Sequence, residues 1–454
     1  MKKILIESWS KMIEHKKILV LGMARSGVSV AKLLARFNND IIITDLKEQE
    51  RDLVEELEAL GIKVHITDKQ EDLVDESFDI VIKNPAIRKD NFAVLRAKNL
   101  GILVVNEVEV AFKFLPENVS VIGITGSNGK TTTTTIVYEL LKSTGRNVFL
   151  GGNIGIPFSS FVLDIKSGDI LVLEISDHQL CDMYDFKANI SALTNLSEVH
   201  IDFHGTYEQY KKTKKKIFNN QTKNDLVILN KDNIDVLEVS QDSEAQKIYF
   251  SSKEIADVYL KDNEILYKNE VVIQTSDIRV KGIHNYENIM VAIAIAKQYG
   301  VTNDNIKKFL STFNGVEHRI EYVRTLNGRK FYNDSKATNN ESTIIALNSF
   351  NEDTILIMGG LDRNIPFDSI APYLKHVTCV FAYGETKDKI REFAHLNHVQ
   401  AISVDHLKEA IFKAYEMSKE GDIILLSPAC ASWDQYKDFE ERGNEFKEVV
   451  NSLR

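Results

Sequence analysis

The sequence of 454 residues has little of what marks secreted, membrane-spanning or nucleic-acid-binding proteins. Its three cysteines, Cys181, Cys379 and Cys430, form no paired framework, which fits a reducing cytoplasm. No apolar run approaches the roughly 20 residues that span a bilayer. The amino-terminal stretch MKKILIESWSKMIEH lacks the apolar core and the cleavage site of a signal peptide. The formal net charge of -10 argues against a nucleic-acid partner. We therefore expect a cytoplasmic protein without a membrane span.

Low-complexity linkers and internal repeats are also missing from the sequence. Hydrophobic residues make up 43% of the chain and charged residues 27%, which is typical of a globular enzyme. A chain of this length is expected to fold into about two to four domains, each with a core of its own.

The strongest signal lies between Val119 and Ile136, in the stretch VSVIGITGSNGKTTTTTI. An apolar run typical of a buried parallel strand is followed by a turn with Gly126 and Gly129, and then by a predicted helix. The spacing G-x-x-G-K-T is a shortened form of the phosphate-binding P-loop. Glycines let backbone N–H groups surround an anion, and the positive end of the helix points at the same place. We expect Lys130 to reach the outer phosphates of a nucleotide and Thr131 to place its hydroxyl on Mg²⁺.

A βαβ unit is predicted over residues 17 to 45, where a strand, a glycine turn, a helix and a second strand ending at Asp45 follow one another. Gly22 and Gly27 occupy two places of a dinucleotide fingerprint, and Ala24 stands where the middle glycine belongs. Three interpretations stay open from this segment alone: a unit that binds no nucleotide, an NAD site, and a uridine-nucleotide site.

Polar residues follow two further buried strands of the central block. DILVLEIS ends at Glu174, where a carboxylate beside the phosphate loop would give Mg²⁺ a hard oxygen ligand. The alternative is an edge carboxylate that holds no metal. His200, Asp202 and His204 lie on a loop after the next strand, in either a structural or a catalytic role. Asn153 follows a glycine pair that lets backbone approach a ligand.

Two other segments of the central block have simpler interpretations. The helix predicted over residues 206–218 carries a run of lysines, and for most of them we expect a solvated face. Residues 240–281 alternate polar and apolar types and predict a small antiparallel flap.

The final third predicts a second doubly wound sheet, with ligand-binding groups beyond the strand ends at Asp334, Lys336, Arg363 and Ser432. The predicted fold class is thus α/β with three domains. Residues 1–110 form an N-terminal Rossmann-like domain, residues 111–314 a central P-loop mononucleotide-binding parallel sheet, and residues 315–454 a C-terminal Rossmann-like domain.

At these motifs the chain resembles the Mur ligase family, the ATP-dependent amino-acid-adding enzymes of peptidoglycan synthesis. The resemblance covers essentially the whole chain. NDSKATN and SPACASWDQYKDFEERGNEF are most similar to the family member that adds D-glutamate to UDP-N-acetylmuramoyl-L-alanine, and the DNPR motif of the diamino-acid-adding member is missing. The resemblance implies that the first domain binds the UDP end, the second binds ATP and metal, and the third binds the amino acid.

The resemblance also implies site residues, carried over one position at a time. For ATP they are Gly126, Ser127, Asn128, Gly129, Lys130, Thr131, Thr132, Asn285, Arg319 and Asp334. For two Mg²⁺ ions they are Thr131, Glu174, His200 and Lys214. For the UDP-sugar and the amino acid they are Arg25, Ser26, Asp45, Lys47, Asn153, Ser176, Thr338, Arg363, Ser432 and Phe439. The catalytic set is Lys130, His200, Lys214 and Lys336. Lys214 is implied to be carbamylated by CO₂, which turns an ammonium into an oxygen anion that can ligate a cation.

The chain departs from the family pattern beside Glu174. The usual E-L-S-S-F-Q-L reads EISDHQL, which introduces Asp177 and His178, and Val199 replaces the acid that usually precedes His200. Asp177 either restores the lost carboxylate or changes the metal shell.

Three rival functions remain at this stage: a folylpolyglutamate-type ligase, an NAD-dependent oxidoreductase, and a nucleotide-binding regulator without catalysis. DSKATN and SPACAS favour the D-glutamate-adding enzyme, and an oxidoreductase leaves the phosphate loop unexplained. We expect the protein to act as a monomer.

Overall fold

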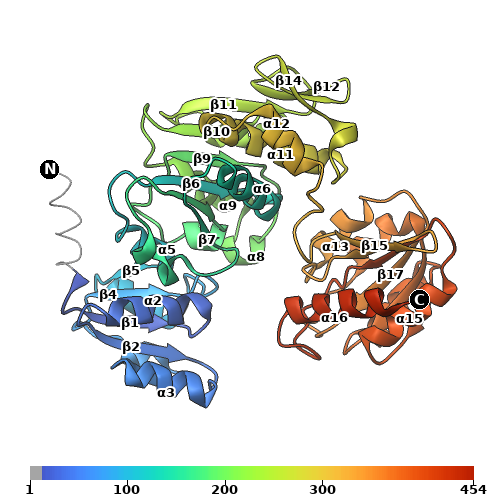
Figure 1. The fold of residues 1–454 in the computed structure, drawn as a ribbon. Helices are drawn as coiled ribbons and strands as arrows, with labels where there is room; N and C mark the ends of the chain where they lie inside the picture. Colours follow the sequence, from blue (N-terminus) through green and yellow to red (C-terminus); the bar gives the residue numbers. More distant parts are fainter. Residues whose placement is uncertain (1–12) are drawn as a thin grey trace. The chain divides into compact units, whose positions relative to one another are not determined.

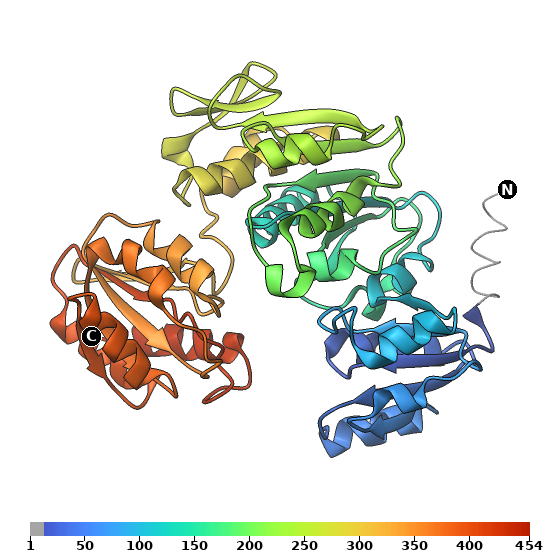
Figure 2. The same ribbon diagram turned by 180° about the vertical axis from the view of Figure 1, so that it is seen from behind.

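The computed structural model describes residues 13–454, in two compact units that divide after Thr312 (Figures 1 and 2). The first unit holds a five-stranded and a nine-stranded sheet, and the second unit, Phe313–Arg454, holds a six-stranded sheet. Most of the stretch in which the sequence predicts no signal peptide lies outside the described residues. Over residues 13–454 the structure contains no helix with the length and apolar character needed to cross a membrane.

The first sheet is parallel throughout, in the order β3-β2-β1-β4-β5. Successive residues of β1 point to opposite faces, so Ile18 and Val20 pack in one apolar cluster and Leu19 and Leu21 in another. This order and these two buried faces confirm the predicted Rossmann-like fold. The elements are β1 (Lys17–Leu21), α2 (Arg25–Ala35), β2 (Asp40–Asp45), α3 (Arg51–Ala59), β3 (Lys63–Ile66), β4 (Ile80–Lys83), α4 (Phe92–Asn99), β5 (Leu103–Val105) and α5 (Glu107–Phe112).

The second sheet has the order β14-β13-β12-β11-β10-β9-β6-β8-β7, and its strands from β7 to β12 pair in parallel. Helices α6 and α11 pack against each other and against strands of this sheet. The main elements are β6 (Ser120–Thr125), α6 (Lys130–Lys142), β7 (Val148–Gly152), β8 (Ile170–Glu174), α7 (Asp177–Leu180), β9 (Ile190–Leu193), α8 (Ile201–His204), α9 (Tyr207–Lys215), β10 (Leu226–Asn230), α10 (Ile234–Val239), α11 (Ile283–Gln298) and α12 (Asn303–Leu310).

The predicted antiparallel flap is only partly correct. The antiparallel ladder joins β12 (Val258–Lys261), β13 (Glu264–Tyr267) and β14 (Glu270–Gln274). β11 (Gln246–Ser251), however, pairs in parallel with β10 and with β12. The helix α10, which separates β10 from β11, returns the chain in the same direction, as a crossover does, and this accounts for the parallel β10–β11 pair.

Buried polar contacts join the first and second sheets within their unit. Lys83 at the end of β4 forms an ion pair with Asp182, 2.8 Å from Nζ to Oδ2, and the two side chains are only 1% and 4% exposed. Glu107 of α5 accepts a hydrogen bond from the backbone N–H of Ser159, and Ser159 donates its hydroxyl to Ser29 of α2 at 2.7 Å. The boundaries at residues 110 and 314 stay predictions.

The third sheet runs β15-β16-β20-β17-β18-β19 and is parallel except for the β15–β16 hairpin. Asn327 and Gly328 turn this hairpin with φ of 48° and 76°, as an Asn-Gly turn requires. Apolar clusters cover both faces, as a doubly wound sheet predicts. The elements are β15 (Glu321–Leu326), β16 (Arg329–Asn333), α13 (Asn340–Leu347), β17 (Thr354–Gly359), β18 (Val377–Tyr383), α14 (Lys387–Leu396), β19 (Gln400–Ser403), α15 (Leu407–Met417), β20 (Ile423–Leu426) and α16 (Phe439–Ser452).

Candidate active site

The phosphate loop lies between β6 and α6, and neighbouring side chains approach its two glycines so closely that neither position has room for a Cβ. Gly129 has φ of 81°, and a Cβ there would lie 2.0 Å from the side-chain oxygen of Asn288 on α11. A Cβ on Gly126 would lie 1.9 Å from the hydroxyl of Thr194. Gly129 is also the N-cap of α6 and gives no side-chain hydrogen bond, so backbone N–H groups at this helix end remain for an anion.

Lys130 and its neighbours keep this loop closed. Lys130 Nζ donates to the carbonyl oxygens of Gly126 at 2.9 Å and Ser127 at 2.8 Å. The Ser127 hydroxyl lies 2.7 Å from that of Tyr210, and the backbone N–H of Asn128 donates to Asn195 at 2.9 Å. Sequence reasoning missed Tyr210 and Asn195. The only local sign of Asn195 is its place directly after a buried strand.

Glu174 ends β8, next to the strand that carries the phosphate loop. Its carboxylate is almost fully buried, at 1% exposure. Oε1 accepts a hydrogen bond from Asn153 at 2.7 Å, whereas the buried Oε2 has no hydrogen-bond partner among the described residues. A buried carboxylate oxygen without a partner costs free energy unless a cation takes that place. Glu174 therefore fits the Mg²⁺ ligand that its position predicts.

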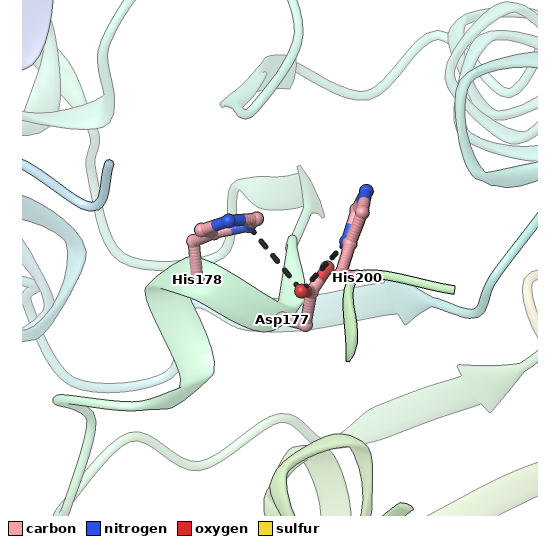
Figure 3. Close-up of side chains that lie close together, drawn as sticks. All are labelled: Asp177, His178 and His200. Carbon is pink, nitrogen blue, oxygen red and sulfur yellow. Dashed lines mark hydrogen bonds and ion pairs between the residues drawn. The ribbon is translucent and has the colours of Figure 1, made fainter. Parts of the chain in front are cut away.

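Asp177 is the centre of a cluster of imidazoles (Figure 3). Its Oδ2 lies 2.9 Å from His200 Nδ1, 2.8 Å from His204 Nε2 and 3.3 Å from His178 Nδ1. Burial alone would raise the pKa of Asp177, but hydrogen bonds from His200 and His204 and the charge of Lys214 hold it well below its ordinary value. Burial lowers the pKa of His178 to about 4, so that imidazole is neutral at pH 7.

The backbone around this cluster differs from the predicted loop. The capping box of Ser176 and Gln179 starts the short helix α7, which presents Asp177 and His178. His200 is the N-cap of α8 with φ of 55°, a left-handed conformation that few residue types adopt. The segment predicted as a loop is thus a helix of four residues, Ile201–His204.

Lys214 is fully buried beside the phosphate loop. Its Nζ donates to the hydroxyl of Thr125 at 3.0 Å and to the carbonyl oxygen of Gly126 at 2.9 Å, and it lies 3.5 Å from Asp177 Oδ1. Burial, with the nearby charge of Lys130, lowers the pKa of Lys214 to about 7. Near pH 7, Lys214 is therefore a neutral amine in a substantial fraction of the molecules, and the neutral amine is the form that reacts with CO₂.

The prediction of a solvated lysine face on α9 is wrong for most of the run. Lys211 is buried and pairs with Glu208, Asp235 and Glu238 at 2.8, 3.3 and 3.0 Å. Lys214 is buried as described above, two further lysines are half-buried, and Lys212 alone of the five is exposed. Carboxylates of α10, which is distant in sequence, explain the burial of Lys211.

The residues predicted for the UDP-sugar end fall in two places: Arg25, Ser26, Asp45 and Lys47 lie at the carboxyl edge of the first sheet, whereas Asn153 and Ser176 follow strands of the second sheet beside Glu174. Asp45 ends β2, and its carboxylate accepts hydrogen bonds from the backbone N–H groups of Met23 at 2.7 Å and Lys47 at 3.1 Å. Ser26 accepts a hydrogen bond from Asn84 at 3.3 Å, and Arg25 is exposed at the start of α2. Arg25, Ser26 and Asp45 thus lie around the glycine turn after β1.

Contacts within the second unit join some of its predicted residues. Asp334 is buried after β16 and accepts hydrogen bonds from Ser427 at 2.7 Å and from the backbone N–H of Ile320 at 3.2 Å. Burial raises the pKa of Asp334 to about 7. Lys336 Nζ lies 5.5 Å from the centre of the Phe439 ring. The Arg363 guanidinium lies 4.8 Å from the centre of the Trp433 ring, and Ser432 is buried. The remaining predicted residues of this unit are Arg319 and Thr338.

Arg442, which the sequence analysis did not predict, links two segments of the second unit by hydrogen bonds. It is fully buried and donates to the Ser335 hydroxyl at 2.9 Å, the Ser335 carbonyl at 2.7 Å and the Cys430 carbonyl at 3.1 Å. It therefore fixes the segments that precede Lys336 and Ser432.

Asn285, the predicted ATP residue on α11 of the first unit, donates its amide to the Lys281 carbonyl at 2.8 Å.

The fold and the site together define a class of protein: a multidomain α/β chain whose central parallel sheet carries a phosphate loop beside a buried carboxylate. Three family models match the chain: the Mur ligase middle domain over residues 124–296, the Mur ligase glutamate ligase domain over residues 318–430, and the Mur ligase family catalytic domain over residues 45–114. The chain belongs to the Mur ligase family and is an ATP-dependent ligase, so the oxidoreductase alternative is set aside.

Similar proteins cover nearly the whole chain. A protein of Geobacillus kaustophilus (strain HTA426), named UDP-N-acetylmuramoylalanine–D-glutamate ligase, is 43% identical over 98% of this chain and 99% of its own length. A protein of the same name from Bacillus cereus (strain G9842) is 44% identical over 97% and 98%. Among solved structures, the UDP-N-acetylmuramate-alanine ligase MurC of Thermotoga maritima has a TM-score of 0.62 at 20% identity, covering 97% of this chain and 100% of that chain. MurF of Acinetobacter baumannii has a TM-score of 0.60 at 14% identity, covering 98% and 92%. The two structures show that the fold is shared.

Proposed function

We propose that this chain adds D-glutamate to UDP-N-acetylmuramoyl-L-alanine in peptidoglycan precursor synthesis, with ATP as the energy source. The observation that carries the proposal is the identity of 43% and 44% to two proteins named for this activity, over nearly the full length of each. The segments NDSKATN and SPACASWDQYKDFEERGNEF add support in the second unit. The function is assigned to the cytoplasm, which the three free cysteines support.

The proposed reaction has two steps. The terminal carboxylate of UDP-N-acetylmuramoyl-L-alanine attacks the γ-phosphorus of ATP, which releases ADP and gives an acyl phosphate. The amine of D-glutamate then attacks the acyl carbon, and the tetrahedral intermediate expels phosphate as the amide forms. Lys130, at the start of α6, offsets negative charge on the transferring phosphoryl group together with the loop N–H groups. Binding that holds both reactants in place supplies the positioning.

The metal ligands proposed for this reaction are Thr131, Glu174, His200 and Lys214. Mg²⁺ bound there would act as a Lewis acid that withdraws charge from phosphoryl oxygens. The unpartnered Oε2 of Glu174 supports the first position. For Lys214, the buried amine with its lowered pKa supports conversion to a carbamate, whose oxygens would face the second of two ions.

The remaining site residues are assigned by the same proposal. We assign Arg25, Ser26, Asp45, Lys47, Asn153 and Ser176 to the UDP-sugar substrate. D-Glutamate is assigned to Lys336, Thr338, Arg363, Ser432 and Phe439, and ATP to Gly126, Ser127, Asn128, Gly129, Lys130, Thr131, Thr132, Asn285, Arg319 and Asp334. The domain limits 1–110, 111–314 and 315–454 and a monomeric state belong to this proposal too, and sedimentation of the purified chain tests the last of them.

The test is release of ADP by the purified chain with ATP, Mg²⁺ and UDP-N-acetylmuramoyl-L-alanine. D-Glutamate, L-glutamate, L-lysine and D-aspartate are offered in turn. We expect sustained ADP release with D-glutamate alone. A preference for another amino acid would overturn the specificity, and absence of release with all four would overturn the ligase assignment.

A further inference from the structure

The cluster around Asp177 contains more donor atoms than the proposed ligase site uses. Asp177 and His178 stand where the family pattern has serine and phenylalanine, and neither is among the metal ligands that the resemblance implies. The structure nevertheless places one ligand atom from each within 4.8 Å of the other and of a ring nitrogen of His200. Two residues that depart from the family pattern thus lie beside one residue of the expected metal site, and Asp177 stands between the two imidazoles (Figure 3).

The separations of both imidazole nitrogens from the Asp177 oxygen match those of ligands on a single ion. Atoms bound to one ion at about 2.0–2.2 Å, at angles between 90° and 110°, lie about 3.0–3.5 Å from one another. Asp177 Oδ2 lies 2.9 Å from His200 Nδ1 and 3.3 Å from His178 Nδ1. The two imidazole rings are 5.1 Å apart and inclined at 61°, so neither ring blocks the other.

The surroundings of these donors suit a bound ion. His204 Nε2 lies 2.8 Å from the same Asp177 oxygen and is itself buried, which holds the carboxylate in place as an outer-shell partner does. Lys214 contacts the other oxygen, Oδ1, at 3.5 Å. The side chains of His178 and His200 are 26% and 46% exposed, so an ion can enter from solvent and keep open coordination positions.

We propose that Asp177, His178 and His200 form a binding site for a first-row transition-metal divalent cation. Two imidazole nitrogens and one carboxylate oxygen suit Mn²⁺, Fe²⁺, Co²⁺ or Zn²⁺ better than Mg²⁺, which prefers oxygen ligands. His200 would then bind this ion in place of the second Mg²⁺ of the proposed ligase site. The site lies beside the phosphate loop, because Lys214 contacts both Asp177 and the carbonyl of Gly126. Binding at this site is independent of which amino acid the ligase adds.

The test is titration of the metal-stripped full chain with Co²⁺, without nucleotide, followed by calorimetry and by visible absorption of the bound ion. We expect one Co²⁺ per chain with nitrogen ligation, not displaced by about a hundredfold excess of Mg²⁺. His178→Phe and Asp177→Ser restore the residues of the family pattern, and the phenylalanine keeps a ring against Phe203, which His178 contacts at 4.0 Å. Each should weaken Co²⁺ binding at least about tenfold, since even outer-shell changes cost about that much.

The matched control is His395→Phe, which removes an exposed histidine from α14 in the second unit and should leave binding unchanged. Unaltered Co²⁺ affinity in His178→Phe would mean that the cluster is only a hydrogen-bond network and would overturn the proposal. Displacement of Co²⁺ by equimolar Mg²⁺ would overturn it as well. If Asp177→Ser fails to fold, as circular dichroism would report, His178→Phe decides. These readouts need no substrate, so a failed ligase assay leaves them interpretable.

Discussion

Replacing Glu107 with glutamine should stabilise the first unit at alkaline pH and leave its stability almost unchanged at acid pH. Glu107 is buried at the junction of the two sheets, and burial raises its pKa from the ordinary 4.5 to about 7, against partial compensation by Ser159. The folded state therefore favours the protonated acid. The stability that this proton provides is fully present below pH about 4.5 and is lost as pH rises through about 7.

The magnitude follows from the two pKa values. Between 4.5 and about 7, at about 1.4 kcal/mol per pH unit, the ionised carboxylate costs the folded state about 3 kcal/mol. Glutamine resembles the protonated acid and keeps a carbonyl oxygen for the N–H of Ser159. Glu107→Gln should thus raise the free energy of unfolding by up to about 3 kcal/mol at pH 8 and by close to zero at pH 4.5.

Urea unfolding of the wild type and Glu107→Gln, at both pH values, measures this difference. Because all other titrating groups are shared, their contributions cancel when the two chains are compared at one pH. Equal differences at pH 4.5 and pH 8, or a less stable variant at pH 8, would show that the carboxylate is not buried as described.

Three further changes test the site and its support. Gly129→Ala puts a methyl group 2.0 Å from the side-chain oxygen of Asn288 on α11 and should cut ADP release about a hundredfold. The control is Gly145→Ala, which is also at positive φ but has open space around it and should leave ADP release unchanged. Equal losses in the two variants would refute the clash. Lys83→Met leaves Asp182 buried without its partner and should cost about 3–5 kcal/mol in urea unfolding, and adding Asp182→Leu should recover much of the loss. Lys214→Ala should abolish ligation, with partial rescue by short carboxylic acids, and full activity without them would refute the carbamate.

The sequence predicted best what is determined locally. The phosphate loop is a strand, a glycine turn and a helix in continuous sequence, and Gly126 and Gly129 take the backbone angles that such a turn needs. The strand order of the first sheet likewise follows from alternating strands and helices, because crossovers of one hand admit few arrangements.

The chemical state of the site depends on contacts between distant segments, which local patterns do not contain. The sequence does not distinguish Lys211, Lys212 and Lys214, yet their exposure differs. Carboxylates of α10 pair with Lys211, and Lys214 donates to the phosphate loop, whereas Lys212 is exposed. In the same way, Asp177 is visible as a departure from a motif, but its position among three imidazoles required the structure. β11 was misjudged because a polar and apolar alternation does not distinguish parallel from antiparallel pairing.

The most direct test of the ligase account follows an oxygen atom. UDP-N-acetylmuramoyl-L-alanine labelled with ¹⁸O in its terminal carboxylate is converted with ATP and D-glutamate, and the released phosphate is analysed by mass spectrometry. Formation of an acyl phosphate transfers one carboxylate oxygen to phosphorus, so the account predicts one ¹⁸O in each phosphate and one in the new amide. Phosphate without label, alongside normal amide formation, would contradict it.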